Sequence, residues 1–367
     1  MATRKKYEVI VVGGGVAGIA AAVTASKAGA KVALIEKNII LGGLAGSGFV
    51  NIFLPLCDGC GNQIIYGEAE TFLNLSIKYG PGMIPPGWGK NPGKKISRYM
   101  THFSSASFSL ALAEYIQGFD IDIWYDTIVT DAIKDGDNLI GVKVFNKSGH
   151  NELFSDYTID ATGDADVAKF ADAPLLFGKS FFSSWSLNTS LGIAESTLKY
   201  EDSDFLLSTL KLGASEGGND DFNGDSYLGI SGKIVSSYVR TSQNKLLEFY
   251  SDQSKNKNSA FPLAFPNLPQ LRTTRRILGR DMILSSNCNI KIDDSVGRIP
   301  SWKEVGKVWD IPKGALIPRG IEKLIVAGRI ISAEEGDALE AARSIPAAAL
   351  TGEIAGEMVM ELISSDK

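Results

Sequence analysis

The stretch YEVIVVGGGVAGIAAAVTASKAGAKVALIEK, residues 7–37, decides the fold of this chain. An apolar run, Val9–Val12, predicts a buried parallel strand, and Gly13, Gly15 and Gly18 follow it with the G-x-G-x-x-G spacing. An alanine-rich helix and a second apolar strand come next. Gly13 permits the tight turn, Gly15 lets a pyrophosphate approach the backbone, and Gly18 lets the helix pack closely on the strand.

An acid ends the second strand. Glu36 stands where a carboxylate can accept hydrogen bonds from a ribose diol, and the N-terminus of the preceding helix offers free N–H groups to phosphates. Because strand, glycines, helix, strand and acid occur in order, the pattern predicts dinucleotide binding. The alternative is a glycine-rich turn that binds no ligand.

The composition is that of an ordinary globular protein with room for two domains. The chain has 367 residues, of which 44% are hydrophobic and 22% charged, and its net charge is −5. Lys and Arg form no long stripe, so neither nucleic acid nor an anionic membrane is expected as a partner. The sequence has no run of 18 apolar residues and no signal-peptide pattern at its start, and its three cysteines imply no disulfide framework. These features predict a cytoplasmic protein.

The chain pattern predicts an α/β fold, in which a small β-meander is inserted into a Rossmann-like domain. A helix is expected from Ser104 or Ser105 to about Gln117, and the glycine- and proline-rich residues 80–95 are expected to form a loop. Four β runs follow, and a short helix from Ala165 to Phe170 comes after them. The four runs are Ile121–Tyr125, Ile128–Ile133, Leu139–Phe145 and Leu153–Ile159.

A change of composition near Pro174 predicts a second, smaller domain over residues 175–312, inserted into a first domain that comprises residues 1–174 and 313–367. Helices are expected near 196–213 and 231–250, with a loop over 217–226 between them. The first domain resumes with a buried strand at Leu324–Ala327. A long final helix is expected from Ser344 to about Leu362, since serine caps helices well and Pro346 fits the first turn.

Several motifs together resemble the FAD-dependent oxidoreductases with a glutathione-reductase-like FAD fold. The chain is most similar to a bacterial family that is distantly related to fumarate reductase flavoproteins. The matching segments cover most of the chain: the glycine fingerprint, Gly42-Gly43, Asp160–Asp164, Arg272–Ile277, and the closing run from Ile311 to Arg329. The resemblance implies FAD as the cofactor and a fold with a discontinuous FAD-binding domain.

The resemblance also implies which residues hold the FAD. The glycine fingerprint would bind the pyrophosphate. Glu36 and its neighbour Lys37 would bind the adenosine ribose. Val129 would present its backbone to the adenine, and the Gly42-Gly43 pair would pass beside the flavin or its ribityl chain. Gly328-Arg329 and the segment Arg343–Ala348 would close over the flavin. The implied set is Gly13, Gly15, Val16, Ala17, Gly18, Glu36, Lys37, Gly42, Gly43, Leu44, Val129, Thr162, Gly163, Gly328, Arg329, Arg343, Ile345, Ala347 and Ala348.

Physical chemistry supports the last part of this assignment. Reduced flavin carries negative charge, which a helix N-terminus at about Ile345–Ala347 and the nearby Arg343 would stabilise. The sequence contains no second complete G-x-G-x-x-G, so no separate nicotinamide domain is expected. Electrons would pass through the substrate, a protein partner, oxygen or a transiently bound nicotinamide.

Four residues are candidates for contact with the substrate. Arg272, Arg275 and Arg276 can bind a carboxylate or phosphate through their guanidinium forks; the alternative is a basic edge that is solvated or paired in salt bridges. On a strand, Arg272 and Arg276 would share a face and Arg275 would take the other; on a helix, all three would lie near one face. His102 can serve as an acid or base beside the flavin, or as a structural histidine.

Two further clusters are weaker candidates, and no metal site is predicted. Cys57 and Cys60 form a C-x-x-C, for which a redox pair, a metal site and two simple thiols are the alternatives. A zinc site needs four ligands and the chain has only three Cys and two His, so simple thiols are favoured. Residues 219–225 imitate half of a calcium loop but lack the glutamate at its twelfth position. The acidic residues Glu334, Glu335, Asp337 and Glu340 are surface charges, partners of Arg329 or Arg343, or part of a pocket mouth.

The sequence as a whole predicts a flavin-dependent oxidoreductase that transfers a hydride between noncovalent FAD and a small organic substrate, an anionic one among the options. Two alternatives remain. One is an FAD-binding electron-transfer subunit that acts with a protein partner. The other is a synthase that consumes its bound dinucleotide.

Overall fold

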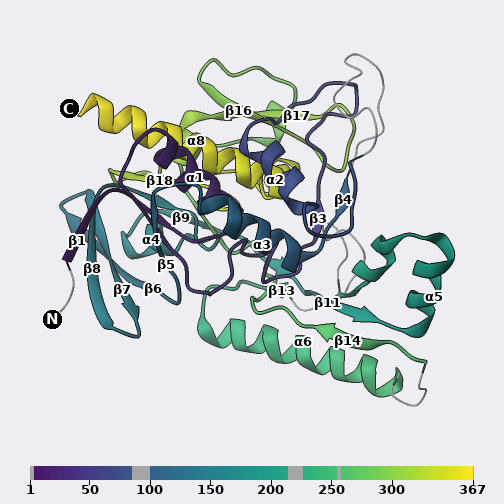
Figure 1. Ribbon diagram of the computed structural model, residues 1–367. Coiled ribbons are helices and arrows are strands. Elements are labelled where there is room, and N and C mark those ends of the chain that lie inside the picture. Colours follow the sequence, from purple (N-terminus) through teal and green to yellow (C-terminus); the bar gives the residue numbers. More distant parts are fainter. Residues whose placement is uncertain (1–3, 85–99, 214–225, 254–257, 367) are drawn as a thin grey trace.

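The computed structural model describes residues 4–84, 100–213, 226–253 and 258–366. Its largest sheet has seven strands in the order β5-β2-β1-β8-β7-β6, with β18 paired to β8 (Figure 1). Their bounds are β1 Arg4–Val12, β2 Val32–Ile35, β5 Ile121–Trp124, β6 Ile128–Asp135, β7 Asn138–Asn146, β8 Gly149–Asp160 and β18 Leu324–Val326. The expected α/β class and the four predicted β runs are confirmed.

The parallel part of this sheet creates the edge at which a nucleotide can bind. β1 lies between β2 and β8, all three run in the same direction, and β18 joins the other side of β8. Val12 at the end of β1 pairs with Ile35 of β2 and Asp160 of β8. Since the carboxyl ends of parallel strands meet at one edge, the segments that follow them converge there.

The meander is continuous with this parallel sheet. β6 and β7 form an antiparallel hairpin, and β7 pairs with the first half of β8, where Gly141 lies opposite Phe154. The last residues of β8, from Thr158 to Asp160, pair instead with β18. One long strand therefore belongs to both the meander and the nucleotide-binding half of the sheet.

Two helices from opposite ends of the chain pack against each other beside the sheet (Figure 1). They are α1 (Val16–Lys27) and α8 (Ile345–Ser365). Glycines on α8 permit the close approach: a Cβ on Gly352 would lie 2.1 Å from the Ala17 carbonyl oxygen, and a Cβ on Gly356 would lie 2.8 Å from that of Ala21. As predicted, Ser344 caps α8 by accepting a hydrogen bond from the Ala347 N–H.

The remaining helices of this part are α2, α3, α4 and α7. α3 begins after Ser104, whose side chain accepts a hydrogen bond from the Ser107 N–H, so the expected helix and its cap are confirmed. The short helix expected after residue 164 is also present. The bounds are α2 Glu68–Ser76, α3 Ser105–Ile116, α4 Asp166–Phe170 and α7 Asp337–Ala342.

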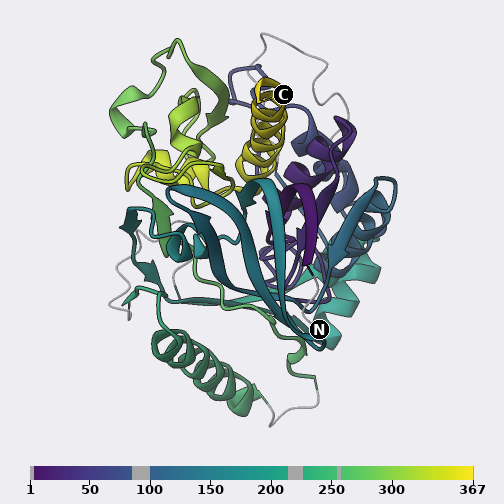
Figure 2. The same cartoon turned by 90° about the vertical axis from the view of Figure 1, so that its left-hand side faces the viewer.

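The middle of the chain forms a smaller layer built on a three-stranded sheet in the order β12-β11-β14. In Figures 1 and 2, helix α6 lies at the bottom of the molecule and α8 in its upper half. The elements of this layer are β10 Ser180–Phe181, β11 Ser183–Thr189, α5 Leu191–Tyr200, β12 Thr209–Gly213, β13 Ser226–Tyr227, α6 Gly232–Gln253 and β14 Phe261–Ala264. β9 Leu175–Phe177 and β15 Arg275–Ile277 pair with each other and pack against the large core.

Short strands and single 3-10 turns complete the described chain. β3 pairs with β4, and β16 pairs with β17. The bounds are β3 Ile52–Phe53, β4 Thr101–His102, β16 Ser295–Pro300, β17 Val308–Pro312, η1 Ser203–Leu207, η2 Ser285–Asn287 and η3 Lys313–Leu316.

The two helices predicted for the middle of the chain had different outcomes. The helix expected near 231–250 is confirmed as α6, but the helix expected near 196–213 is wrong. α5 already ends at Tyr200, because Glu201 adopts a left-handed conformation with φ 51° and Asp202 caps the 3-10 turn η1 through the Asp204 N–H. Residues 209–213 then form β12, which pairs with β11.

The apolar core has one large part and one small part. The large core joins the main sheet to α1 and α8, and the small one consists of Phe182, Tyr227, Tyr238 and Leu271. The predicted domain boundaries at 174/175 and 312/313 stay a prediction. The calcium-like run over 219–225, and the loop expected over 80–95 from residue 85 onward, lie outside the described residues.

Candidate functional site

The turn between β1 and α1 forms the first wall of the site. Gly13 has φ +104°, and a Cβ there would lie 2.4 Å from the carbonyl oxygen of Ala161. Gly18 faces inward, since a Cβ on it would lie 1.8 Å from the Gly13 carbonyl oxygen. Gly15 caps α1 through its backbone only, so the first N–H groups of the helix remain available to an anion. The turn thus has the geometry that the fingerprint predicts.

The second glycine pair crosses the first one at close range. The Gly42 N–H donates to the Gly14 carbonyl at 2.9 Å, and a parallel β-bridge joins Gly15 to Gly42. A Cβ on Gly43, which has φ +55°, would lie only 3.0 Å from the Gly15 α-carbon. Two bare backbone segments therefore form one continuous floor.

Glu36 braces the same turn from the end of β2. Its Oε2 accepts from the Gly14 N–H at 2.6 Å, and its Oε1 accepts from the backbone and the side chain of Asn38 at 2.8 and 2.9 Å. The Thr127 N–H donates to the Glu36 carbonyl, which brings the start of β6 to this place. Glu36 is buried, with 5% of its surface exposed, yet it still lines the cavity described below.

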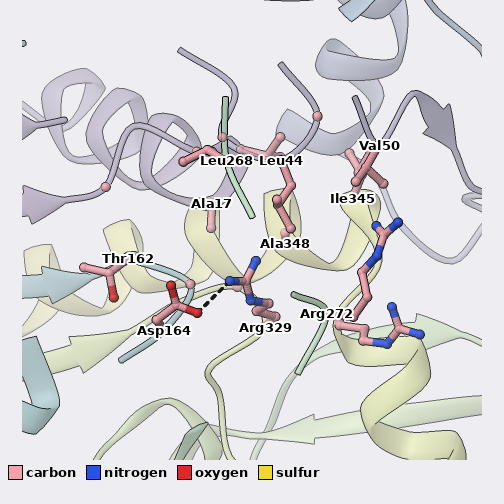
Figure 3. A pocket seen from close by; sticks show the side chains of 18 of the residues that line it. Ala17, Leu44, Val50, Thr162, Asp164, Leu268, Arg272, Arg329, Ile345 and Ala348 are labelled. Atoms are coloured by element: carbon pink, nitrogen blue, oxygen red, sulfur yellow. Dashed lines mark hydrogen bonds and ion pairs between the residues drawn. The ribbon is translucent and has the colours of Figure 1, made fainter. Parts of the chain in front are cut away.

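The segment after β8 contacts Arg329 at the wall of the cavity (Figure 3). Arg329 Nη2 donates to Asp164 Oδ1 at 2.8 Å, and the Thr274 hydroxyl donates to the same oxygen at 2.7 Å. Burial alone would raise the pKa of Asp164, but Arg329 and Thr274 outweigh it and hold this pKa below its usual range. Asp164 thus joins the end of β8, the loop after β18 and the segment before β15.

The buried carboxyl of Asp160 holds the same segment through hydrogen bonds. Asp160 ends β8 and accepts hydrogen bonds from Thr162 N–H, Thr162 hydroxyl and Ala168 N–H. Burial nevertheless raises the pKa of Asp160 to about 6. Burial and the charge of Asp164 also raise the pKa of Asp166, although Arg275 opposes that shift.

The closing wall comes from the loop after β18 and from the start of α8. The Gly328 N–H donates to the Thr351 hydroxyl at 3.0 Å, and Gly328 approaches Ala17, since a Cβ on Gly328 would lie 3.1 Å from the Ala17 Cβ. Arg343, just before α8, donates from Nε to Glu340 Oε1 at 3.0 Å and from Nη2 to Glu340 Oε2. These contacts hold the N-terminus of α8 at the cavity.

All of these walls line one cavity of about 490 Å³. Among the residues expected to hold FAD, Gly18 and Ala347 do not line it: Gly18 is a packing contact of the turn, and the Ala347 N–H is bonded to Ser344. Those that line it are Gly13, Gly15, Val16, Ala17, Glu36, Lys37, Gly42, Gly43, Leu44, Val129, Thr162, Gly163, Gly328, Arg329, Arg343, Ile345 and Ala348.

Of the four substrate candidates, only Arg272 lines the cavity. Arg275 pairs with Asp166, and buried Arg276 donates from Nε to the Ala333 carbonyl at 2.7 Å. His102 lies on β4 opposite Ile52, with an exposed side chain. β15 begins only at Arg275, so Arg272 is not part of the strand that orients the other two arginines.

Arg272 lies over the ring of Trp185, with 4.8 Å between Cζ and the ring centroid. Burial lowers the pKa of Arg272 to about 10, and the nearby charge of Arg343 acts in the same direction. The guanidinium therefore remains protonated at neutral pH. Tyr238 and Glu340 oppose the shift.

Several residues around Arg272 are not identifiable from the sequence. Trp185, Trp302 and Lys303 line the cavity, and no motif marks them. Of the acidic residues weighed before the last helix, Glu335, Asp337 and Glu340 line the cavity, and Glu340 pairs with both Arg343 and Lys303. The remaining one, Glu334, accepts a hydrogen bond from the Ser285 N–H.

The cysteines and acidic groups form no metal site within the part of the chain that the structure describes. Cys57 is buried, Cys60 is exposed and Cys288 is half-buried, and all three are free thiols. Asp58 organises the turn between the first two by accepting hydrogen bonds from Cys60 and Asn62. A redox role for Cys57 and Cys60 stays a hypothesis.

A glycine turn at the edge of a parallel sheet, with an acid at the end of the second strand, defines a dinucleotide-binding fold. The model of the family "FAD dependent oxidoreductase" matches residues 8–185 and 230–366. This chain belongs to that family, so it is an FAD-dependent oxidoreductase and FAD is its cofactor.

Comparison with solved structures gives the same fold at low sequence identity. p-Nitrophenol 4-monooxygenase PnpA from Pseudomonas putida DLL-E4 is 14% identical, with a TM-score of 0.56, and the match covers 99% of this chain and 81% of that one. The myxobacterial chondrochloren halogenase CndH is also 14% identical, with a TM-score of 0.50 and coverages of 99% and 76%.

None of the curated proteins matches this chain. No helix within the described residues has both the length and the apolar character needed to cross a membrane.

Proposed function

We propose that this protein transfers a hydride between noncovalent FAD and a small organic substrate, which binds at the Arg272 end of the cavity. A single observation carries the proposal: one cavity is lined both by the glycine turns and by Arg272 and Arg343. The Arg272 guanidinium at that end suits a substrate with a negative group.

The fit of FAD to this cavity is supported by its shape and by its donors. Gly13, Gly15, Val16 and Ala17 would hold the pyrophosphate at the N-terminus of α1, where a side chain at position 15 or 43 would narrow the approach. Glu36 and Lys37 would hold the adenosine ribose, and Val129 would lie along the adenine. Gly42, Gly43, Leu44, Thr162 and Gly163 would flank the rest of the cofactor.

The flavin end would lie between Arg329, Arg343 and the start of α8. When bound, FAD supplies a ring system that accepts or releases a hydride. The N-terminus of α8, with Ile345 and Ala348 lining the cavity, presents the positive end of a helix dipole to it. Arg343 adds a positive charge that Glu340 orients. These groups favour the reduced, more negative state of the bound cofactor.

Anaerobic reduction tests the proposal. The protein is purified with its FAD, reduced with dithionite, freed of excess reductant and mixed with panels of organic acids, alcohols and ketones while the flavin absorbance is followed. Recovery of oxidised flavin with a small molecule is expected, and Arg272→Gln should slow that recovery without loss of FAD.

Three results would contradict the proposal. A correctly folded but colourless protein that refuses FAD would remove its basis. A flavin that is reoxidised only by a second protein would favour the electron-transfer subunit, and release of an adenylated product other than FAD on heating would favour the synthase.

A further inference from the structure

The arginines in the cavity differ in whether a carboxylate neutralises them. Arg329 has Asp164 at 2.8 Å, and Arg343 has both oxygens of Glu340. Arg272 has no ion pair or hydrogen bond to its guanidinium among the contacts recorded for the described residues; its recorded close contact is the ring of Trp185. Among these three arginines, Arg272 is therefore the one without a recorded direct carboxylate contact.

The ring of Trp185, over which the Arg272 guanidinium lies, holds that guanidinium in place. Trp185 is buried on β11, and Lys211 lies over its ring as well, 4.4 Å from the centroid. The backbone N–H of Trp185 donates to Gln270 Oε1 at 2.6 Å, and Gln270 Nε2 donates to the carbonyl of Gly48. Gln270 thereby ties β11 to the loop after the second glycine pair. A stacked, planar guanidinium loses little entropy when it forms a two-pronged bond with a carboxylate.

Apolar side chains form one wall of the cavity at this end. Val50, Ile52 and Leu54 line it from the segment around β3, and Met100 lines it from the segment before β4. Figure 3 shows Val50 and Ile345 on the same side of the cavity as Arg272, whereas Thr162 and Asp164 lie on the other side. A ligand that lies against this wall can reach the stacked Arg272 guanidinium with its charged group and the hydrocarbon side chains with its body.

We infer that the Arg272 end of the cavity takes an organic acid with a single negative charge and an apolar body. This inference rests on the proposed function, because it names the substrate class of the same site. The carboxylate binds the outward edge of the Arg272 guanidinium, and the apolar body lies along Val50, Ile52 and Leu54. A second acid group would face that hydrocarbon wall without a partner.

Direct binding to the FAD-loaded protein tests the inference. Three probes are compared by isothermal titration calorimetry and by the shift they cause in flavin absorbance: 3-phenylpropionate, its neutral counterpart 3-phenyl-1-propanol, and the dianion glutarate. The monoacid is expected to bind at least about 10-fold more tightly than either of the others, since a bond to a charged group contributes roughly that factor.

Variants assign the effect to Arg272. Arg272→Gln should weaken 3-phenylpropionate binding by about 10- to 100-fold and leave binding of the alcohol unchanged, while Arg272→Lys should retain part of the affinity. Trp185→Phe should weaken it by a few-fold, because phenylalanine holds a cation less strongly. Arg280→Gln is the matched control, since Arg280 pairs with Glu322 and does not line the cavity.

Each other outcome overturns the inference. Equal binding of acid and alcohol removes the role of the charge, and tighter binding of glutarate replaces the monoacid class by a diacid class. Loss of FAD from Arg272→Gln assigns Arg272 to the cofactor. A wild-type protein that holds no FAD contradicts the proposed function itself, whereas a yellow protein that does not distinguish the three probes contradicts only this inference.

Discussion

The Gly42 N–H donates to the carbonyl oxygen of Gly14 at 2.9 Å, and this bond joins the two glycine-rich turns. The crossing brings Gly43 against Gly15 with no side chain between them. Each turn alone is a common feature of α/β folds, but the two together form a floor of bare backbone along which an extended dinucleotide can lie. The absence of side chains at these positions is therefore a requirement of the site.

Replacement of Gly43 by alanine tests this requirement. A Cβ there would lie 3.0 Å from the Gly15 α-carbon, so Gly43→Ala should destabilise the protein by about 1–3 kcal/mol and weaken FAD binding. Urea unfolding and titration of apoprotein with FAD measure the two effects. Gly29→Ala is the control, because Gly29 has φ +90° but nothing within 4 Å of its Cβ position. Equal losses in both variants would assign the effect to backbone strain instead of the crossing.

Replacement of Glu36 by glutamine keeps the shape of the side chain and removes its charge. The Glu36 carboxylate accepts three hydrogen bonds, from Gly14 and from Asn38, and glutamine must turn an NH₂ group toward one set of these donors. We expect Glu36→Gln to weaken FAD binding about 10-fold or more, since such bonds contribute about 1.5–3 kcal/mol each. Quenching of FAD fluorescence measures the affinity, and exposed Glu361→Gln should leave it unchanged. Unaltered affinity in Glu36→Gln would show that the carboxylate is dispensable.

Much of the fold and of the cofactor cavity could be predicted, because local rules act there. Val9–Val12 and Gly13 lie in a strand and a turn that need only neighbouring residues, and Ser344 caps α8 by the same kind of rule. The helix expected near 196–213 failed for a local reason as well: Glu201 and Asp202 end α5, and the alternating residues after them pair with β11.

The substrate end could not be predicted to the same extent, because it depends on contacts between distant segments. Nothing in the sequence distinguishes Arg272 from Arg275 and Arg276. The difference comes from partners that are distant in sequence: Asp166 binds Arg275, and the Ala333 carbonyl binds Arg276. Trp185 carries no motif, and its position against Arg272 depends on Gln270, 85 residues away.

The ion pair between Asp164 and Arg329 should be coupled in a double-mutant cycle. Asp164→Asn leaves the Arg329 guanidinium without its counter-charge, and Arg329→Gln leaves Asp164 with only Thr274. Each single variant should lose about 1–3 kcal/mol of unfolding free energy, and the double variant should lose less than the sum by about 1 kcal/mol. Chemical unfolding of all four proteins measures this. Additive losses would show that the two side chains act independently. The exposed pair Arg280 and Glu322 is the control, for which a coupling below about 0.5 kcal/mol is expected.

The buried carboxyl of Asp160 should make stability depend on pH in the direction opposite to an ordinary salt bridge. Burial raises the pKa of Asp160 from its ordinary value of 3.8 to about 6, so the folded state holds this proton more tightly than the unfolded state. The resulting stabilisation is complete below pH 3.8 and is lost as the pH rises through 6. Between pH 5 and pH 7.5 the loss amounts to about 1 kcal/mol.

Comparison with Asp160→Asn isolates this group from the other titrating residues. Asparagine has no proton to lose, so the unfolding free energy of the wild type minus that of the variant should fall by about 1 kcal/mol from pH 5 to pH 7.5. Urea unfolding of both FAD-loaded proteins at the two pH values measures the difference. Asp166→Asn is the companion variant, because its charge lies near Asp160 and raises the pKa further; its removal should shift the transition to lower pH. A difference that stays constant, or that grows with pH, would show that the hydrogen bonds from Thr162 and Ala168 outweigh burial and keep Asp160 ionised.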